Sequence, residues 1–535
     1  MSENKSQSYL HGAAILTASM IIIKVLGAIY KIPLYNILGT EGTAIFTAAY
    51  NIYNVLLTLS TAGLPVALSR LIAEANALGR PMQVKRVFHV GLWAFIVLGA
   101  AGSLVMYLFP TELAAFTGNV EASQSILALS PSVILVCLMS AYRGYAQGHS
   151  NMTPTSVSQV LEVAVKVAVG LLLAWFLLGS GKSLPIVSAG AIIGVPIGTA
   201  VACAYIIFNK RKFDKLSFRP LKSPDVPEKS TKILANLIKI GIPIALGSSV
   251  LSIIALIDTK IVYERLQFAV GLSYEEVKHL AGIYSEAMTL YNMPGAFITS
   301  LTISVVPAIA ACVALRDRQK AKDISESSLR IATILSLPMG IGLSVLSRPI
   351  MQVLYVSNTD EGPILLAIMG ITSYFMCMAL MTTAILQAYG SERMPVISMI
   401  IGGIVKSAAN WVLIAIPSIN IYGAPLGTLI CYIVMCAINY MFIYKKLQTR
   451  LRISKFFVKP FISSAVMGTA AFIVFFALSG VLGDDRLRMA VGMAAAAGTG
   501  VIVYLIMIIK TKSITGEDMN LIPKGDKLAR LLKIK

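Results

Sequence analysis

The sequence predicts an all-α polytopic membrane protein with about 14 transmembrane helices, and three observations support this fold class. Apolar residues make up 56% of the 535 residues and charged residues only 13%, whereas an ordinary soluble domain is about 25% charged. The mean hydropathy of the chain is +0.78. Apolar stretches of roughly 20 residues, the length that crosses about 30 Å of hydrocarbon as a helix, recur from Ala13 to Ile509.

Charged residues, prolines or polar turns separate these stretches, and the alternating ten-residue segments of a membrane barrel do not occur in the sequence. The first span is expected to be retained, because the N-terminus lacks the basic region of a cleaved signal peptide. In chain order, the expected spans lie near 12–37, 43–69, 87–110, 122–147, 154–178, 184–208, 233–263, 280–314, 328–355, 362–389, 395–416, 422–444, 460–481 and 489–509.

The net charge of +20 is concentrated in alternate loops. When successive loops are assigned to opposite sides, 33 Lys and Arg residues fall on one side and 6 on the other, with eight of them in 209–232. Loops rich in Lys and Arg stay in the cytoplasm, so we expect both termini to be cytoplasmic. The positive charge is therefore explained by topology, and the expected partner is the lipid bilayer rather than nucleic acid.

Two pairs of landmarks indicate an internal repeat of six spans. The run Tyr145–Pro154 resembles Leu386–Pro395, at an offset of 241 residues, and Pro65 and Pro307 are offset by 242. Two six-span halves in the same orientation are typical of carriers with a central cavity between two lobes. The expected organisation is an N-lobe (1–208, spans 1–6), a basic cytoplasmic linker (209–232), a C-lobe (233–446, spans 7–12), two appended spans (447–510) and a basic cytoplasmic tail (511–535).

Several lysines lie inside the expected spans, where a charge costs about 2.5–3.5 kcal/mol on insertion scales. Span one carries Lys24 and Lys31, span five carries Lys166, and span eleven carries Lys406. Lys166 and Lys406 follow the repeated prolines by 12 and 11 residues, so each lobe offers a lysine at matching depth. This pattern suits a cavity that holds an anion from both sides. The alternatives are snorkelling to the interface, above all for Lys31, and neutralisation of Lys166 by Glu162 at i,i+4.

One carboxylate, Asp258, lies well inside span seven. Asn410 and Thr428 offer neutral oxygens that suit a hard cation such as Na⁺ together with this carboxylate. The alternative is that Asp258 pairs with Lys260 or Lys406.

Other classes of site find no support in the sequence. The six cysteines lie inside apolar spans without a Cys-x-x-Cys pattern, so no metal or redox site is predicted. The four histidines are scattered, no paired-acid motif occurs, and no Walker-type glycine loop is present. We therefore expect neither an enzyme nor an ATP-driven pump, and no cofactor.

Several short motifs resemble the polysaccharide-biosynthesis exporters of the MOP superfamily, and within it the Gram-positive MurJ and SpoVB group of lipid II flippases. The resemblance covers roughly residues 10–510. It rests on Lys24-Val-Leu-Gly27 with Ile37-Leu-Gly39, Gly63-Leu-Pro-Val-Ala-Leu-Ser69, Arg143-Gly-Tyr-Ala-Gln-Gly148 with Ser158-Gln-Val-Leu-Glu162, and Val405-Lys-Ser-Ala-Ala-Asn410.

The resemblance implies a bacterial cytoplasmic-membrane flippase of two six-helix lobes plus two helices. Such a protein moves a polyprenyl-diphosphate-linked glycan, first of all lipid II, from the inner to the outer leaflet. The resemblance also implies that Lys24 stands where the family has a basic residue in its first helix, and that Asp258, Asn410 and Thr428 match a sodium site of part of the family.

The chain departs from this family pattern at several positions. Tyr30, Leu57 or Thr58, and Thr289 stand where Gram-negative members carry arginines, and Ile414 replaces a second acid of the sodium site. The anion is therefore expected to be held by Lys24, Lys31, Arg143, Lys166 and Lys406, with Glu162 in support.

The expected mechanism is alternating access, driven by the membrane potential with or without coupled Na⁺ or H⁺. A flippase for another polyprenyl-linked glycan, of capsule or teichoic type, is the first alternative. A multidrug or cation antiporter of the same superfamily is the second, although its cationic substrates would favour an acidic cavity.

The charge distribution predicts the topology directly. In a variant free of native cysteines, Lys222→Cys should be labelled by an impermeant thiol reagent only after the cells are permeabilised, because 209–232 is expected to be cytoplasmic. Labelling in intact cells would contradict this topology.

Overall fold

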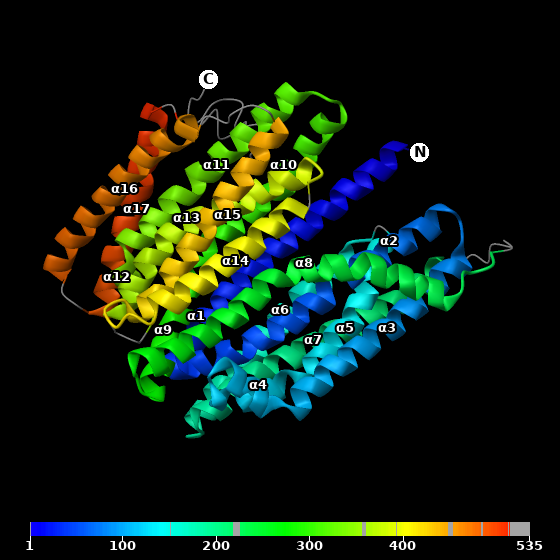
Figure 1. The fold of residues 1–535 in the computed structure, drawn as a ribbon, viewed down its shortest axis with the longest axis horizontal. Helices are drawn as coiled ribbons and strands as arrows, with labels where there is room; N and C mark the ends of the chain where they lie inside the picture. Colours follow the sequence, from blue (N-terminus) through cyan, green and yellow to red (C-terminus); the bar gives the residue numbers. More distant parts are fainter. Residues whose placement is uncertain are drawn as a thin grey trace. The chain divides into compact units, whose positions relative to one another are not determined.

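The computed structural model describes residues 2–149, 151–217, 225–355, 360–391, 393–447, 453–482, 485–511 and 513, and within them every regular element is helical (Figure 1). The contacts divide the chain into two compact units, Met1–Glu264 and Arg265–Lys535. The first unit contains α1 (Ser2–Ala62), α2 (Leu64–Ala77), α3 (Pro81–Leu108), α4 (Pro110–Thr117), α5 (Ser123–Gly148), α6 (Thr153–Gly179), α7 (Leu184–Ser217) and α8 (Ser230–Arg265).

The second unit contains α9 to α17. In it, α13 packs against α11, α15 and α10, and the pair α16–α17 packs against α11 (Figure 1). Its helices are α9 (Tyr274–Tyr291), α10 (Met293–Ala314), α11 (Arg318–Val345), α12 (Ser347–Leu354), α13 (Glu361–Ala388), α14 (Arg393–Leu413), α15 (Gly423–Leu447), α16 (Ile453–Leu482) and α17 (Arg486–Thr511).

The structure confirms an all-helical polytopic chain, and the expected number of 14 spans stays a prediction. Within the described residues, 12 helices are long and apolar enough to cross a membrane. Within α1, two helical stretches meet at a kink at Gly39, whose φ of 65° and ψ of −176° are open mainly to glycine, and this kink lies between expected spans one and two. The expected span 280–314 is divided at Asn292 into α9 and α10. α9 carries four charged residues, including Glu286, whereas α10 carries none.

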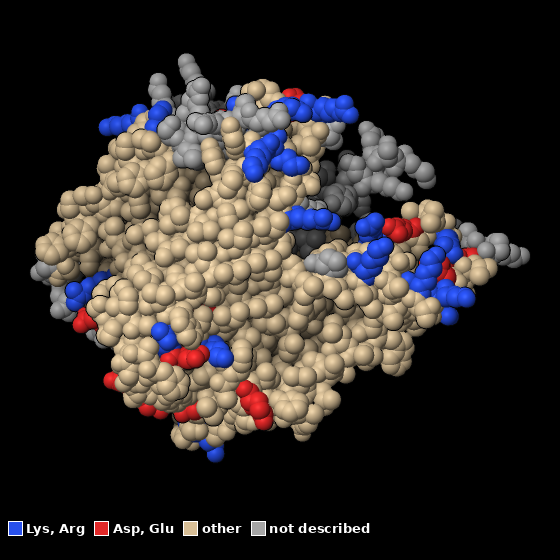
Figure 2. All heavy atoms as spheres, in the orientation of Figure 1, with Lys and Arg blue, Asp and Glu red and all other residues tan. Residues whose placement is uncertain are grey.

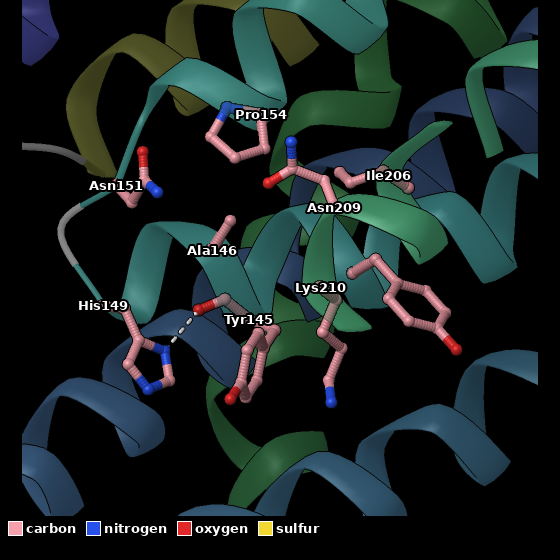
Figure 3. Close-up of a pocket in the computed structure, with 9 residues that line it drawn as sticks. Tyr145, Ala146, His149, Asn151, Pro154, Ile206, Asn209 and Lys210 are labelled. Carbon is pink, nitrogen blue, oxygen red and sulfur yellow. Dashed lines mark hydrogen bonds between the residues drawn. The ribbon is translucent and has the colours of Figure 1, made fainter. Parts of the chain in front are cut away.

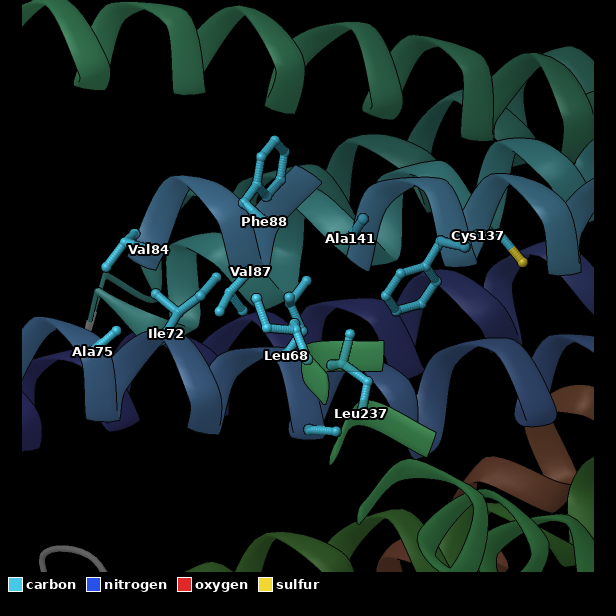
Figure 4. Close-up of a cluster of buried hydrophobic side chains, with 12 residues drawn as sticks. Leu68, Ile72, Ala75, Val84, Val87, Phe88, Cys137, Ala141 and Leu237 are labelled. Atoms are coloured by element: carbon cyan, nitrogen blue, oxygen red, sulfur yellow. The ribbon is translucent and has the colours of Figure 1, made fainter. Parts of the chain in front are cut away.

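The first compact unit includes α8, which the repeat assigned to the C-lobe. Ile233 and Leu237 of α8 are buried in a cluster with α2, α3 and α5 (Figure 4). Farther along α8, Thr259 accepts a hydrogen bond of 2.8 Å from the Asn51 side chain of α1. The lobe boundary at 209–232 and the repeat of six spans stay predictions, because a division by compactness does not test repeat symmetry. Most of the expected tail, 514–535, lies outside the described residues.

Close packing in this cluster depends on small residues. A Cβ at Gly91 of α3 would lie 2.7 Å from Leu68 Cδ1, and one at Gly148 of α5 would lie 2.7 Å from Ile72 Cβ. Leu68 and Ile72 of α2 are themselves fully buried. The glycines therefore let α3 and α5 approach α2 closely, which holds the end of α5 that carries Arg143.

Charged side chains are sparse on the described surface. Figure 2 shows faces of both units that are largely free of Lys, Arg, Asp and Glu, with the coloured residues gathered near helix ends. This distribution is the one that a hydrocarbon environment requires of membrane-spanning helices.

The C-terminal end of the 209–232 linker is held at the start of α3 by a group of residues that we call the connector clamp: Arg80, Gln83, Asp225 and the backbone of Val226 and Glu228. Asp225 accepts hydrogen bonds of 2.9 Å from Arg80 Nε and from the Gln83 N–H. Arg80 Nη2 donates to the Val226 carbonyl at 2.8 Å, and the Glu228 N–H donates to Gln83 Oε1 at 2.7 Å. Asp225 thus supplies the capping oxygen at the N-terminus of α3, where no residue of the helix itself does so.

The ionised state of Asp225 maintains this clamp at neutral pH. Burial raises the pKa of the Asp225 carboxyl, but the Gln83 N–H and the Arg80 guanidinium outweigh burial and hold the pKa below its ordinary value. A carboxyl with a lowered folded-state pKa stabilises the fold above its ordinary pKa of about 4, and loses that contribution as the pH falls through the lowered value.

We predict that Asp225→Asn weakens the connector clamp and frees the C-terminal end of the linker. At neutral pH, trypsin should cleave after Lys229 severalfold faster in inside-out vesicles, because the charged hydrogen bond to Arg80 is lost. Glu228→Gln is the matched control, since the Glu228 carboxylate makes only an exposed pair with Lys232. Equal cleavage of the two variants would contradict the clamp.

Candidate functional site

The helix pair α6–α7 fixes the backbone that carries Glu162 and Lys166. On α7, Gly190, Gly194 and Gly198 recur every four residues and face α6. A Cβ at Gly194 would lie 2.7 Å from the Lys166 carbonyl oxygen, and one at Gly198 would lie 2.5 Å from that of Glu162. Both distances are too short for any side chain, so the glycines allow the two backbones to touch.

Glu162 forms an ion pair with Arg143 of α5 and not with Lys166. Arg143 Nη2 lies 3.0 Å from Glu162 Oε2, and the side chains are 11% and 20% exposed. Arg143 Nε also donates to Ser158 Oγ at 3.0 Å, while Thr199 Oγ1 donates to Glu162 Oε1 at 3.1 Å. Both carboxylate oxygens are therefore engaged. The alternative suggested by the i,i+4 spacing, a Glu162–Lys166 pair, is not formed, because the longer Arg143 side chain reaches Glu162 from a neighbouring helix.

Lys166 is instead held by aromatic side chains of α1. Its Nζ donates to the Tyr50 hydroxyl at 2.8 Å and lies 4.6 Å from the Tyr50 ring centroid and 5.3 Å from that of Tyr30. Tyr50 stacks on Phe46, and the Tyr30 hydroxyl donates to the Ala191 carbonyl at 3.3 Å. Among the described residues, no carboxylate contacts the Lys166 ammonium. The charge of Lys166 is thus stabilised only by neutral groups.

The second unit buries Lys406 and Asn410 of α14 and Thr428 of α15, which are 7%, 0% and 4% exposed. Lys406 and Asn410 are one helical turn apart. A Cβ at Gly427 would clash with Asn410 Oδ1, so glycine is needed for α15 to pass this side chain. The structure therefore brings Asn410 next to the turn of α15 that carries Thr428.

The remaining predicted residues lie in the first unit. Asp258 of α8 is 6% exposed. It belongs to a different compact unit from Asn410 and Thr428, so the three-residue cation site stays a prediction. Lys31 is half-buried in α1, and the Lys24 side chain lies outside the described set. The described residues contain no group of three or more His, Cys, Asp and Glu that could hold a metal ion.

Four side chains that contact the charged cluster were not identified from the sequence: Tyr30, Tyr50, Ser158 and Thr199. Ser158 stands four residues before Glu162, and Thr199 directly follows a glycine of α7, so both carried a weak local signal. Tyr50 lies 116 residues from Lys166, and no sequence pattern links them.

A separate hollow lies where α5, α6 and α7 meet at their expected cytoplasmic ends (Figure 3). Its volume of about 20 Å³ is the space of one water molecule. Lys210 Nζ lies 4.6 Å from the ring centroids of both Phe88 and Tyr145, and His149 Nδ1 donates to the Tyr145 carbonyl at 2.9 Å. The hollow is too small for a glycan or a diphosphate, so the charged cluster around Lys166 is the stronger candidate.

Comparison with known families and relatives supports a transporter. The family model described as "Polysaccharide biosynthesis protein" matches residues 9–313, and the MatE model matches 243–412. The chain is 26% identical to the Lipid II flippase MurJ of Bacillus subtilis over 524 residues, which cover 94% of this chain and 95% of that protein. It is 24% identical to Stage V sporulation protein B of the same organism over 527 residues, covering 97% and 98%.

Two solved structures illustrate the shared fold. A Lipid II flippase MurJ in an inward closed conformation matches with a TM-score of 0.69 at 16% identity, over 92% of this chain and 98% of that chain. An inward-facing MATE family multidrug transporter of the MOP superfamily matches with a TM-score of 0.63 at 15% identity, over 81% and 98%. At these identities the likeness concerns the fold.

We predict that the Arg143–Glu162 pair stabilises the first unit through charge balance. Arg143→Leu should destabilise the protein by roughly 3 kcal/mol, because it leaves a largely buried carboxylate without its cation. The double change Arg143→Leu, Glu162→Leu should recover most of this loss. Apparent melting temperatures of the purified protein in detergent would measure both effects, and a double variant no more stable than Arg143→Leu would refute the charge-balance account.

Proposed function

We propose that this chain is a flippase. It belongs to the polysaccharide biosynthesis protein family, whose members are transporters of the MOP superfamily and not enzymes. Its substrate is a polyprenyl-diphosphate-linked glycan, which it moves from the inner to the outer leaflet by alternating access. Lipid II is the first candidate glycan, because a relative named as a lipid II flippase matches almost end to end. A capsule- or teichoic-type glycan is the alternative.

The observation that carries this proposal is the excess of cations within apolar helices of both units. Lys406 is 7% exposed in α14, and Lys166 lies half-buried in α6 without a carboxylate contact among the described residues. A lysine inside the membrane costs about 2.5–3.5 kcal/mol on insertion scales. A substrate diphosphate offsets this cost, since charges attract more strongly in a site of low dielectric constant. An exporter of cationic drugs would gain nothing from these lysines.

We assign the residues as follows. Lys24 and Lys406 bind the diphosphate from the two lobes, and Lys31 and Lys166 add positive charge on the N-terminal side. Arg143, first considered as a substrate ligand, holds Glu162 in place. Outward movement of each negative charge gains about 2.3 kcal/mol per 100 mV of inside-negative potential. A cation bound by Asp258, Asn410 and Thr428, either Na⁺ or H⁺, is the proposed coupling ion.

We predict that the double variant Lys24→Ala, Lys406→Ala loses the ability to rescue a bacterium depleted of its lipid II flippase, because both cationic ligands are removed. Lys24→Arg should retain partial function, since the charge survives in a different shape. Lys182→Ala, at an exposed loop position, removes the same charge and should rescue fully.

Expression and membrane insertion must be equal in all of these variants. Full rescue by a well-expressed double variant would show that the two lysines are not substrate ligands. If even the unchanged chain does not rescue the strain, the substrate is another polyprenyl-linked glycan and not lipid II.

A further inference from the structure

The charged cluster of the first unit contains two cations and one carboxylate. Arg143 and Glu162 neutralise one another at 3.0 Å, and Ser158 and Thr199 each make one further hydrogen bond to this pair. Lys166 lies one helical turn from Glu162 on α6 and contacts neutral groups only, among the described residues. The cluster therefore carries one positive charge that no described side chain balances.

The donors that surround this charge match an oxyanion. A lysine ammonium has three N–H donors, and a tyrosine hydroxyl can donate one hydrogen bond while accepting another. Lys166 uses one of its donors on the Tyr50 hydroxyl at 2.8 Å, and in doing so leaves the Tyr50 proton available. Two ammonium N–H groups and the Tyr50 O–H remain for a ligand. Lys166 and Tyr50 are both only half-buried.

Neighbouring groups hold these donors in place without competing for them. The Tyr30 hydroxyl is engaged with the Ala191 carbonyl, and the Tyr30 ring supports the ammonium at 5.3 Å. The Tyr50 ring is fixed by stacking on Phe46, with centroids 5.5 Å apart. Glu162 does not repel an incoming anion strongly, because Arg143 balances its charge.

We propose that Lys166 and the Tyr50 hydroxyl form a binding site for one phosphate of the transported lipid diphosphate, and that Arg143 keeps Lys166 available by engaging the Glu162 carboxylate one helical turn away. This inference rests on the proposed function and names the group of the substrate that the first unit binds. Lys166 is thus a substrate ligand, and Arg143 and Glu162 are positioning residues.

The test is a binding measurement on the full chain in nanodiscs, with undecaprenyl diphosphate as the charged probe and undecaprenol as its uncharged counterpart. Native mass spectrometry reports both affinities. The unchanged protein should prefer the diphosphate, and Lys166→Gln should reduce that preference about 10- to 100-fold, the range expected for a hydrogen bond to a charged group. Lys166→Arg should keep part of the preference, and Tyr50→Phe should lower it severalfold.

Lys239→Gln is the matched control, because it removes an exposed lysine from α8 in the same unit and should leave the preference unchanged. Equal losses in Lys166→Gln and Lys239→Gln would overturn the site, since they would show a general charge effect. An undiminished preference in Lys166→Gln with an unaltered melting temperature would overturn the site alone. If Lys166→Gln does not fold, Tyr50→Phe decides, and an unchanged preference in that variant overturns the site.

The failure of the proposed function has a different signature. If the unchanged protein binds undecaprenyl diphosphate no better than undecaprenol, the lipid-diphosphate function is overturned, and the phosphate site with it.

Discussion

Hydrocarbon offers no hydrogen-bond partners, and this constraint shapes the protein from its backbone to its charged groups. The backbone must satisfy its own N–H and C=O groups, so every regular element in the described part of the chain is helical. Several hydroxyl groups within the helices follow the same rule. Ser249, Ser285 and Ser336 each donate to the carbonyl four residues earlier in their own helix. Polar side chains can therefore be carried at depth without a partner from another helix.

Because lipid is as apolar as leucine, helices in a membrane associate through close packing rather than through the hydrophobic effect. The glycines of α7 meet this requirement where they touch the backbone of α6, and Gly427 does so where α15 passes Asn410. The same contacts that stabilise the helix pairs thus set the positions of Glu162, Lys166 and Asn410. A structural device and the candidate site share these residues, so a larger side chain at Gly198 would disturb both.

Charge balance connects the packing to function. Arg143, Glu162 and Lys166 form a cluster in which one pair is neutralised and the other cation, among the described residues, contacts tyrosines. Removing charges from water is costly, and a protein retains such groups where they act on a ligand or an ion. In the proposed site, a bound anionic substrate would complete the balance, and its departure would leave the cluster positive. The cluster is suited to a carrier, which must bind its substrate without holding it permanently.

Composition, hydropathy and the short motifs were sufficient to predict an all-helical membrane transporter of the polysaccharide biosynthesis family, because span length and apolar content are set by the bilayer and are local properties of the chain. Pro154, near the start of α6, marked that boundary for the same reason. Local spacing failed where partners come from different helices. The spacing suggested Glu162 as a partner for Lys166. In the fold, Glu162 forms an ion pair with Arg143, and Lys166 donates a hydrogen bond to Tyr50, which lies 116 residues away in the sequence. Only the tertiary structure decided these partners, because a side chain in a helix bundle interacts with whichever neighbouring helix its own packing brings within reach.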